Sequence, residues 1–231
     1  MISDERAALD ALDEGAIPQY LDAHSHLPGP RANLALVGAL TDVAPPELAF
    51  ALADDPDEFR RLCGTAALGR LLTGDDGTAL AVVESRAAEG FWRVREGAAM
   101  ALQRLGDDDP AALRRVVSEW SAHPDPLVAR AAVAGICEPR LLADAQTALA
   151  ALDACAAATD VLRRVPAQRR REPDVRTLRK GLGYCWSVAV AGDPDTGLPR
   201  FAALSDDPDP DVRWIVRENR RKARLRRLLP D

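Results

Sequence analysis

Aromatic residues, paired cysteines and long apolar runs are all scarce in this chain of 231 residues. Aromatic side chains make up only 4% of it, so its core must be packed from small and aliphatic residues, which favours closely packed helices. None of the four cysteines forms a Cys-x-x-Cys pair, which argues against a zinc ribbon or a thioredoxin-like site. No apolar run approaches the roughly 18 residues of a membrane span, and the polar N-terminus does not resemble a signal or transit peptide. We therefore expect an all-α, cytoplasmic protein with reduced cysteines and no membrane partner.

Lysine is also rare, since Lys180 and Lys222 are the only two and arginine supplies the other basic side chains. The 30 basic and 36 acidic residues give a formal net charge of −6. Residues 160–231 hold 17 basic and 11 acidic side chains, whereas residues 1–159 hold 13 and 25. The basic final third indicates either an anionic partner for that end or solvated arginines that balance Asp-rich turns.

One unit recurs along the chain: an Asp or Pro turn, an aliphatic residue beside Arg, and a helix of small residues. Its anchors are separated by intervals of 35, 34, 47 and 37 residues, counted from Phe59 through Val94, Val128 and Val175 to Val212. Repeats of this length are typical of stacked helical pairs.

Each part of the unit has a mechanical reason. An Asp in the turn caps the free N–H groups of the following helix, and Pro is tolerated in the first helical turn. Small residues such as Gly64 and Gly97 allow neighbouring helices to approach closely. Amphipathic stretches precede these helices at Thr78–Ala88, Ala111–Ser121 and Ala145–Leu162. The unit is therefore predicted to be helix A, a turn and helix B.

With these turns, the Val-Arg pairs and the small residues that follow, the chain resembles the HEAT-repeat family of armadillo-like α-solenoids. The resemblance covers most of residues 45–228. It implies a right-handed α-α superhelix of about five helical pairs, continuous over residues 45–231 and preceded by an N-terminal helical cap over residues 1–44. It also implies a non-enzymatic scaffold that binds a macromolecule on the concave face formed by its B helices. A protein is the expected partner, but the fold does not identify it.

The repeated arginines have two interpretations. They can form a ladder between repeats, in which Asp57, Asp174 and Asp211 pair with Arg60, Arg176 and Arg213. Alternatively, they line the concave face and bind an anionic ligand, with nucleic acid as a possible partner of the basic end. The candidate binding residues are Arg95, Arg130, Arg176, Tyr184, Trp186, Arg213, Trp214 and Arg217. The tail from Arg213 to Arg227 is predicted to form one last helix with a basic outer face.

The sequence offers little for catalysis. A Trp-x-Val-Arg-Glu motif begins at Trp92 and again at Trp214. It resembles the HEAT-like DNA alkylation-repair glycosylases, which hold a cationic base between tryptophans and a carboxylate. The resemblance implies Trp92 and Glu96 as aromatic wall and carboxylate, with Trp186 or Trp214 as a further wall. This family has Asp where Glu96 stands, and a repeat would duplicate the motif by itself, so we expect repeat packing and no enzyme activity, with a glycosylase as the alternative.

We expect neither a metal site nor a cofactor. His24 and His26 would point in different directions on a helix, and no glycine-rich phosphate loop follows a strand pattern. The ligand and the oligomeric state are not encoded in any motif that we find.

Overall fold

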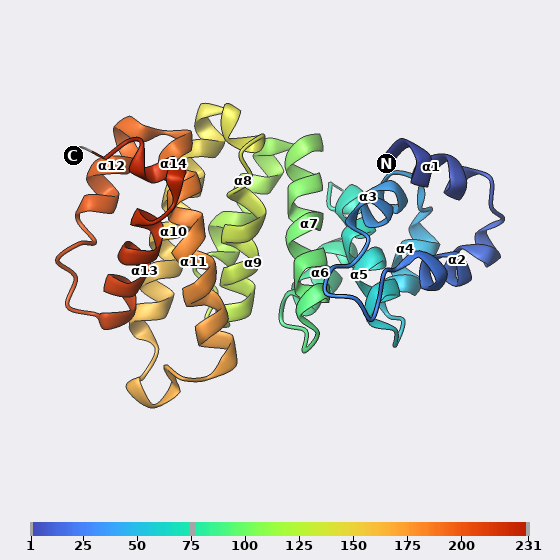
Figure 1. Ribbon diagram of the computed structural model, residues 1–231, viewed down its shortest axis with the longest axis horizontal. Helices are drawn as coiled ribbons and strands as arrows, with labels where there is room; N and C mark the ends of the chain where they lie inside the picture. The colour runs from blue at the N-terminus through green and yellow to red at the C-terminus, as the bar shows by residue number, and fades with distance from the viewer. Residues whose placement is uncertain (1, 74–76, 230–231) are drawn as a thin grey trace. The chain divides into compact units, whose positions relative to one another are not determined.

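The computed structural model describes residues 2–73 and 77–229, and this part of the chain consists of helices and their connections, with no strand (Figure 1). Three helices come first: α1 (Ile2–Asp10), α2 (Ile17–His24) and α3 (Leu34–Val43). Five consecutive pairs follow within the described residues: α4 (Pro46–Ala53) and α5 (Glu58–Ala67), α6 (Thr78–Ala87) and α7 (Trp92–Asp108), α8 (Pro110–Trp120) and α9 (Pro126–Ile136), α10 (Ala145–Arg164) and α11 (Pro173–Gly192), α12 (Pro194–Ala202) and α13 (Pro210–Arg220). The short α14 (Ala223–Arg226) comes last.

The chain divides into two compact units, Met1–Asp108 and Asp109–Asp231. In the first unit α3, α5 and α7 lie side by side, while α4 packs on α5 and α6 on α7. In the second unit α9, α11 and α13 lie side by side, while α8 packs on α9, α10 on α11 and α12 on α11. We call α3, α5, α7, α9, α11 and α13 the B helices. The all-α repeat fold of armadillo and HEAT type is therefore confirmed, whereas one continuous solenoid and a division at residue 44 stay predictions.

The Asp turns act as the sequence predicts. The side chains of Asp57, Asp125 and Asp209 each accept a hydrogen bond from a backbone N–H in the first turn of a B helix. Pro126 and Pro210 occupy the first helical position, where the missing N–H costs nothing. Local capping thus fixes where the B helices start.

Glycines set how closely the helices pack. A Cβ at Gly64 would overlap the backbone of α4, and one at Gly97 would lie 2.9 Å from the carbonyl oxygen of Leu62 in α5. The small residues therefore permit the close approach that the repeat pattern predicts.

The end of the chain differs from the prediction. The last helix does not run on to Arg227, because α13 ends at Arg220 and Lys222 has an extended backbone before α14 begins. In the described residues no helix has the length and apolar character needed to cross a membrane.

Candidate functional site

Arginines at the fourth position of three B helices hold the preceding turns. Arg95 donates to the carbonyl oxygens of Glu89 and Gly90, at 2.5 and 2.9 Å. Arg213 donates in the same way to the carbonyls five and six residues before it, at 2.7 and 3.0 Å. Arg61 bonds the carbonyl six residues before it at 2.7 Å. The guanidinium groups of Arg95 and Arg213 thus clamp the turns between helices A and B, and their role as ligand contacts stays a prediction.

Ion pairs between repeats are present, but with partners other than the predicted ones. Arg179 of α11 donates to Asp211 of α13 at 2.6 Å, so Asp211 does not pair with Arg213 of its own helix. In the first unit, Arg93 of α7 reaches Glu58 of α5 at 3.2 Å. These pairs tie α11 to α13 in the second unit and α5 to α7 in the first.

Of the three tryptophans considered as ligand contacts, Trp186 and Trp214 pack against other residues of the second unit. Trp186 is only 1% exposed, and its indole N–H donates to the Thr159 hydroxyl at 3.1 Å, so its assignment as a binding residue is wrong. Trp214 is half-buried: the edge of its six-membered ring packs at Gly183, and the Arg179 guanidinium lies 4.6 Å from the ring centroid.

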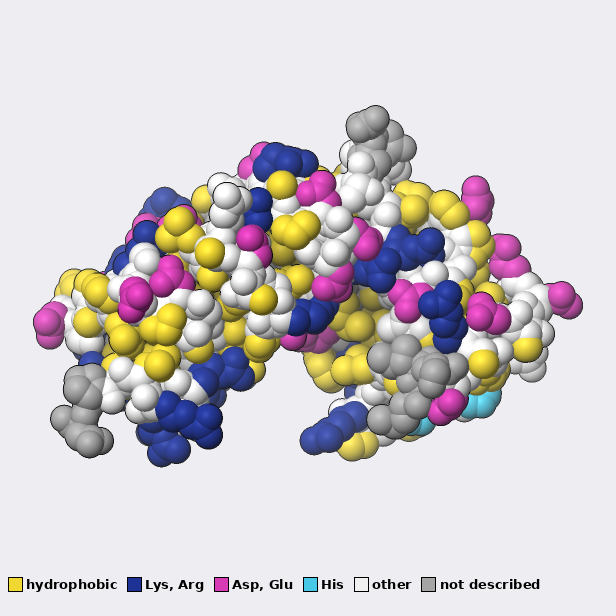
Figure 2. Space-filling view, turned by 90° about the horizontal axis from the view of Figure 1, so that it is seen from above, with side chains coloured by type: hydrophobic (Ala, Val, Ile, Leu, Met, Phe, Trp, Pro, Cys, Tyr) yellow, Lys and Arg dark blue, Asp and Glu magenta, His cyan; other side chains and the backbone are white. Residues whose placement is uncertain are grey.

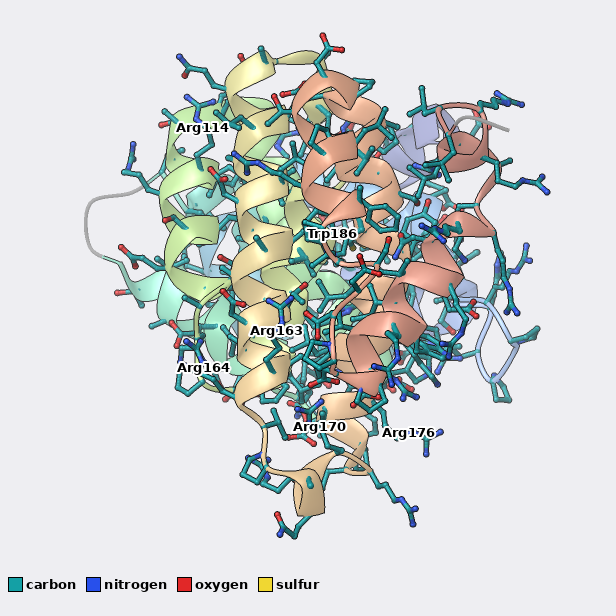
Figure 3. All side chains as sticks on the ribbon, turned by 90° about the vertical axis from the view of Figure 1, so that its left-hand side faces the viewer. Arg114, Arg163, Arg164, Arg170, Arg176 and Trp186 are labelled. Carbon is teal, nitrogen blue, oxygen red and sulfur yellow. The ribbon has the colours of Figure 1, made fainter. Side chains whose placement is uncertain are left out.

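Exposed side chains remain in one row along α11. Arg176, Lys180 and Tyr184 follow each other at four-residue spacing, which puts them along one side of the helix. Arg176 and Lys180 have no hydrogen bond or ion pair to any described residue. Figure 3 shows Arg176 on the opposite side of the unit from Arg164 of α10. Arg217 of α13 is likewise exposed and unpaired within the described ranges.

Tyr184 is surrounded by cations from the end of the chain. The Arg224 guanidinium donates to its hydroxyl at 2.8 Å and lies 5.0 Å from the ring centroid. The Lys222 ammonium lies 5.7 Å from the same centroid. These contacts place the two cations beside the α11 row.

The neighbouring B helices extend this row. A Cβ at Gly181 would lie 3.2 Å from the Arg130 side chain, so Arg130 of α9 borders the α11 row. We call the set Arg130, Arg176, Lys180, Tyr184, Arg217, Lys222 and Arg224 the cationic face. Glu218 of α13 lies beside Gly183 of α11, and it pairs with Arg221 at 2.7 Å. The second unit holds 21 basic and 17 acidic residues, and Figure 2 shows one cluster of dark blue side chains at the lower left of that view.

Trp92 and Glu96 meet in a different place, a pocket of about 500 Å³ in the first unit. Both come from α7, as do Met100 and Gln103, and the opposite wall comes from residues 30–34. Trp92 is 51% exposed and has the Arg93 guanidinium 4.6 Å from its ring centroid. No second aromatic residue of the described chain lines this pocket, so it lacks the further wall that the glycosylase interpretation assigns to Trp186 or Trp214.

The cysteines do not offer a nucleophile. The Sγ atoms of Cys137 and Cys155 lie 3.8 Å apart in the core of the second unit. The thiol contact with Cys155 raises the pKa of Cys137, and burial raises the pKa of Cys155, so both stay protonated at neutral pH. No group of three or more His, Cys, Asp or Glu side chains among the described residues is placed to hold a metal ion.

No family model matches the chain, and no curated protein matches it. Among solved structures it is similar to an engineered protein, with 16% identity and a TM-score of 0.39 over 94% of both chains. It is also similar to a designed armadillo repeat protein in complex with the peptide (KR)4, with 14% identity and a TM-score of 0.39 over 94% of this chain and 96% of that one. A second designed armadillo repeat protein has 15% identity and a TM-score of 0.32 over 87% and 97%. At these scores the likenesses carry no argument about a ligand.

The structure adds residues that the sequence patterns did not single out. Lys180 could have been found, because it lies midway between Arg176 and Tyr184 at helical spacing. Lys222 and Arg224 belong to the basic tail that the sequence analysis describes, but their place beside Tyr184 could not be predicted, because the break after α13 is what returns them to it.

Proposed function

We propose that the protein is a non-catalytic binding scaffold whose cationic face takes up an acidic, extended segment of a partner protein. One observation carries the proposal: Arg176, Lys180 and Arg217 are exposed on adjacent B helices and have no partner among the described residues. Unpaired cations on one face create a positive potential that attracts carboxylates and speeds their association.

The spacing of these cations suits an extended chain. Side chains four residues apart on a helix are separated by about 6 Å along its axis. Alternate side chains of an extended peptide are about 6.6 Å apart and point the same way. Carboxylates at every second position of the ligand can therefore meet Arg176 and Lys180 in turn.

The affinity must come from several such contacts. An exposed ion pair contributes only about 0.2–1 kcal/mol and is screened by salt, so no single pair can hold the ligand. Tyr184, with its ring 45% exposed, adds an apolar contact beside the charges.

Nucleic acid is the competing ligand for the same face, and two observations weigh against it. The first unit holds 19 acidic and nine basic residues, which repel a polyanion. The Arg224 guanidinium and the Lys222 ammonium lie over the ring of Tyr184, so a base would have to displace them to stack on it. A carboxylate-bearing chain of lower charge density is favoured.

Fluorescence anisotropy with a labelled peptide of alternating glutamate and serine tests the proposal at low salt. The double substitution Lys180→Glu and Arg217→Glu should weaken binding by about tenfold or more, which corresponds to about 1.4 kcal/mol. The matched control is the double substitution Arg115→Glu and Arg164→Glu, which makes the same charge change at exposed residues of α8 and α10 and should leave the affinity unchanged.

Two results would overturn the proposal. One is equal loss of affinity in the Arg115→Glu, Arg164→Glu control, which would mean that net charge alone attracts the peptide. The other is duplex DNA binding more tightly than the peptide, with affinity that falls steeply as salt rises, which would identify phosphates as the ligand of this face.

A further inference from the structure

The pocket of the first unit has a rigid wall. Arg93 donates to the carbonyl oxygen of Gly29 at 3.2 Å while it pairs with Glu58. At the other end of the wall, the Asn33 side chain donates to Glu5 and caps α3 by accepting from the N–H of Leu36. Residues 30–32 are therefore tethered at both ends, at Gly29 to α7 and at Asn33 to α1 and α3, and the pocket is already formed without a ligand.

The pocket leaves large apolar side chains open to water. Leu34 is 57% exposed and Trp92 is 51% exposed, and Met100 and Leu62 also line the cavity. Phe91, next to Trp92, is a further large apolar side chain that is exposed. An exposed tryptophan beside a formed cavity is typical of the anchor points of protein interfaces, and apolar side chains exposed next to it mark an interaction site.

The charged side chains around the pocket indicate which charged group a ligand should carry beside its apolar part. Arg93 already uses its terminal nitrogens on Glu58 and Gly29, and only its buried Nε is without a partner among the described residues; Glu96 already takes part in an interaction within the chain. Arg31 is exposed and has no hydrogen bond or ion pair to the described residues. The charge that the pocket offers to a ligand is therefore a guanidinium, whose best partner is a carboxylate.

We infer that this pocket binds a short linear segment of a protein in which two apolar side chains are followed by an acidic residue. The apolar side chains cover Trp92 and Leu34, and the carboxylate meets Arg31. A volume of about 500 Å³ accommodates two side chains of leucine size. This site is separate from the cationic face and does not depend on the function proposed for that face.

The test uses a labelled peptide with the sequence Gly-Ser-Leu-Leu-Glu-Ser and a second peptide with lysine in place of glutamate. Binding is measured in the Lys180→Glu, Arg217→Glu background, so that the cationic face does not contribute. We expect saturable binding of the glutamate peptide, roughly tenfold weaker after Trp92→Ala. Arg31→Glu should reverse the preference, so that the lysine peptide binds more tightly.

Two further variants distinguish binding in the pocket from binding elsewhere on the surface. Leu34→Ala removes an exposed side chain at little cost to folding and should also weaken binding. Leu149→Ala, which removes a 40% exposed leucine of α10, is the matched control and should have no effect. Absence of binding, equal binding of both peptides, or binding that persists in Trp92→Ala and Leu34→Ala would each overturn the inference.

Discussion

Gly64→Ala should destabilise the first unit, although alanine is the better helix former. Gly64 lies where α5 crosses α4, and a Cβ there would fall well inside 3.0 Å of the Ala53 nitrogen and the Leu52 carbonyl carbon. Both are backbone atoms, so no side-chain rotation relieves the overlap and the helices must separate. Overpacking of this kind costs typically about 1–3 kcal/mol, and we expect the upper end. Helix propensity returns about 1 kcal/mol, so the net loss should be about 2 kcal/mol.

Gly38→Ala supplies the matched control within the same unit. Gly38 lies in α3, and a Cβ there meets no atom within 4 Å, so the substitution should stabilise the protein by about 0.5–1 kcal/mol. Urea titrations of the full chain, followed by far-UV circular dichroism, compare the two variants. If both variants were stabilised, or both destabilised, the close approach of the α4 backbone would not be what determines the effect of an alanine at residue 64.

Two further predictions concern the second unit. The Asn219 side chain is fully buried in α13, where it accepts a hydrogen bond from the Ser187 N–H at 2.8 Å and donates one to the Leu182 carbonyl at 2.9 Å. Asn219→Ala should therefore lower the free energy of unfolding by about 2 kcal/mol, measured by urea titration. An unchanged urea midpoint would contradict this role of Asn219. Burial opposes the ionisation of Asp209, but hydrogen bonds led by that from Arg170 outweigh it and hold the pKa of Asp209 below its ordinary value. A depressed native pKa adds stability that is present above about pH 4 and is lost as the pH falls through the native pKa. The midpoint temperature of thermal unfolding should therefore fall as the pH is lowered, and it should fall less steeply in Arg170→Gln than in the unsubstituted protein. Equal dependence on pH in the two proteins would contradict the stabilising pair of Arg170 and Asp209.

Much of the fold could be predicted because its signals are local. The stretch predicted over Thr78–Ala88 forms α6, and that over Ala145–Leu162 forms α10. Both helices start where they are predicted to start and end within two residues of the predicted C-terminal residue. Capping by Asp and close packing at Gly depend on residues next to each other in the chain. The break between α13 and α14 carries no Pro or Gly to announce it, so the tail was predicted as one helix.

The candidate site was predicted less well because it depends on which side of a helix faces solvent. Tyr184 and Trp186 are two residues apart, about 200° around the helix, so one can face water only if the other faces the core. The clamp formed by Arg95 depends on the backbone path of its turn, which helical spacing does not give. The pocket joins residues 30–34 to α7, and no pattern along the chain connects segments so far apart.

The most direct test of the central claim is to locate a bound acidic peptide on the protein. A photo-reactive peptide of alternating glutamate and serine, cross-linked to the full chain and mapped by mass spectrometry, should label residues 173–192 and 210–227. These segments contain α11, α13 and α14, which carry most of the cationic face. Labels concentrated on α8, α10 and α12, or spread evenly over the surface, would contradict the account.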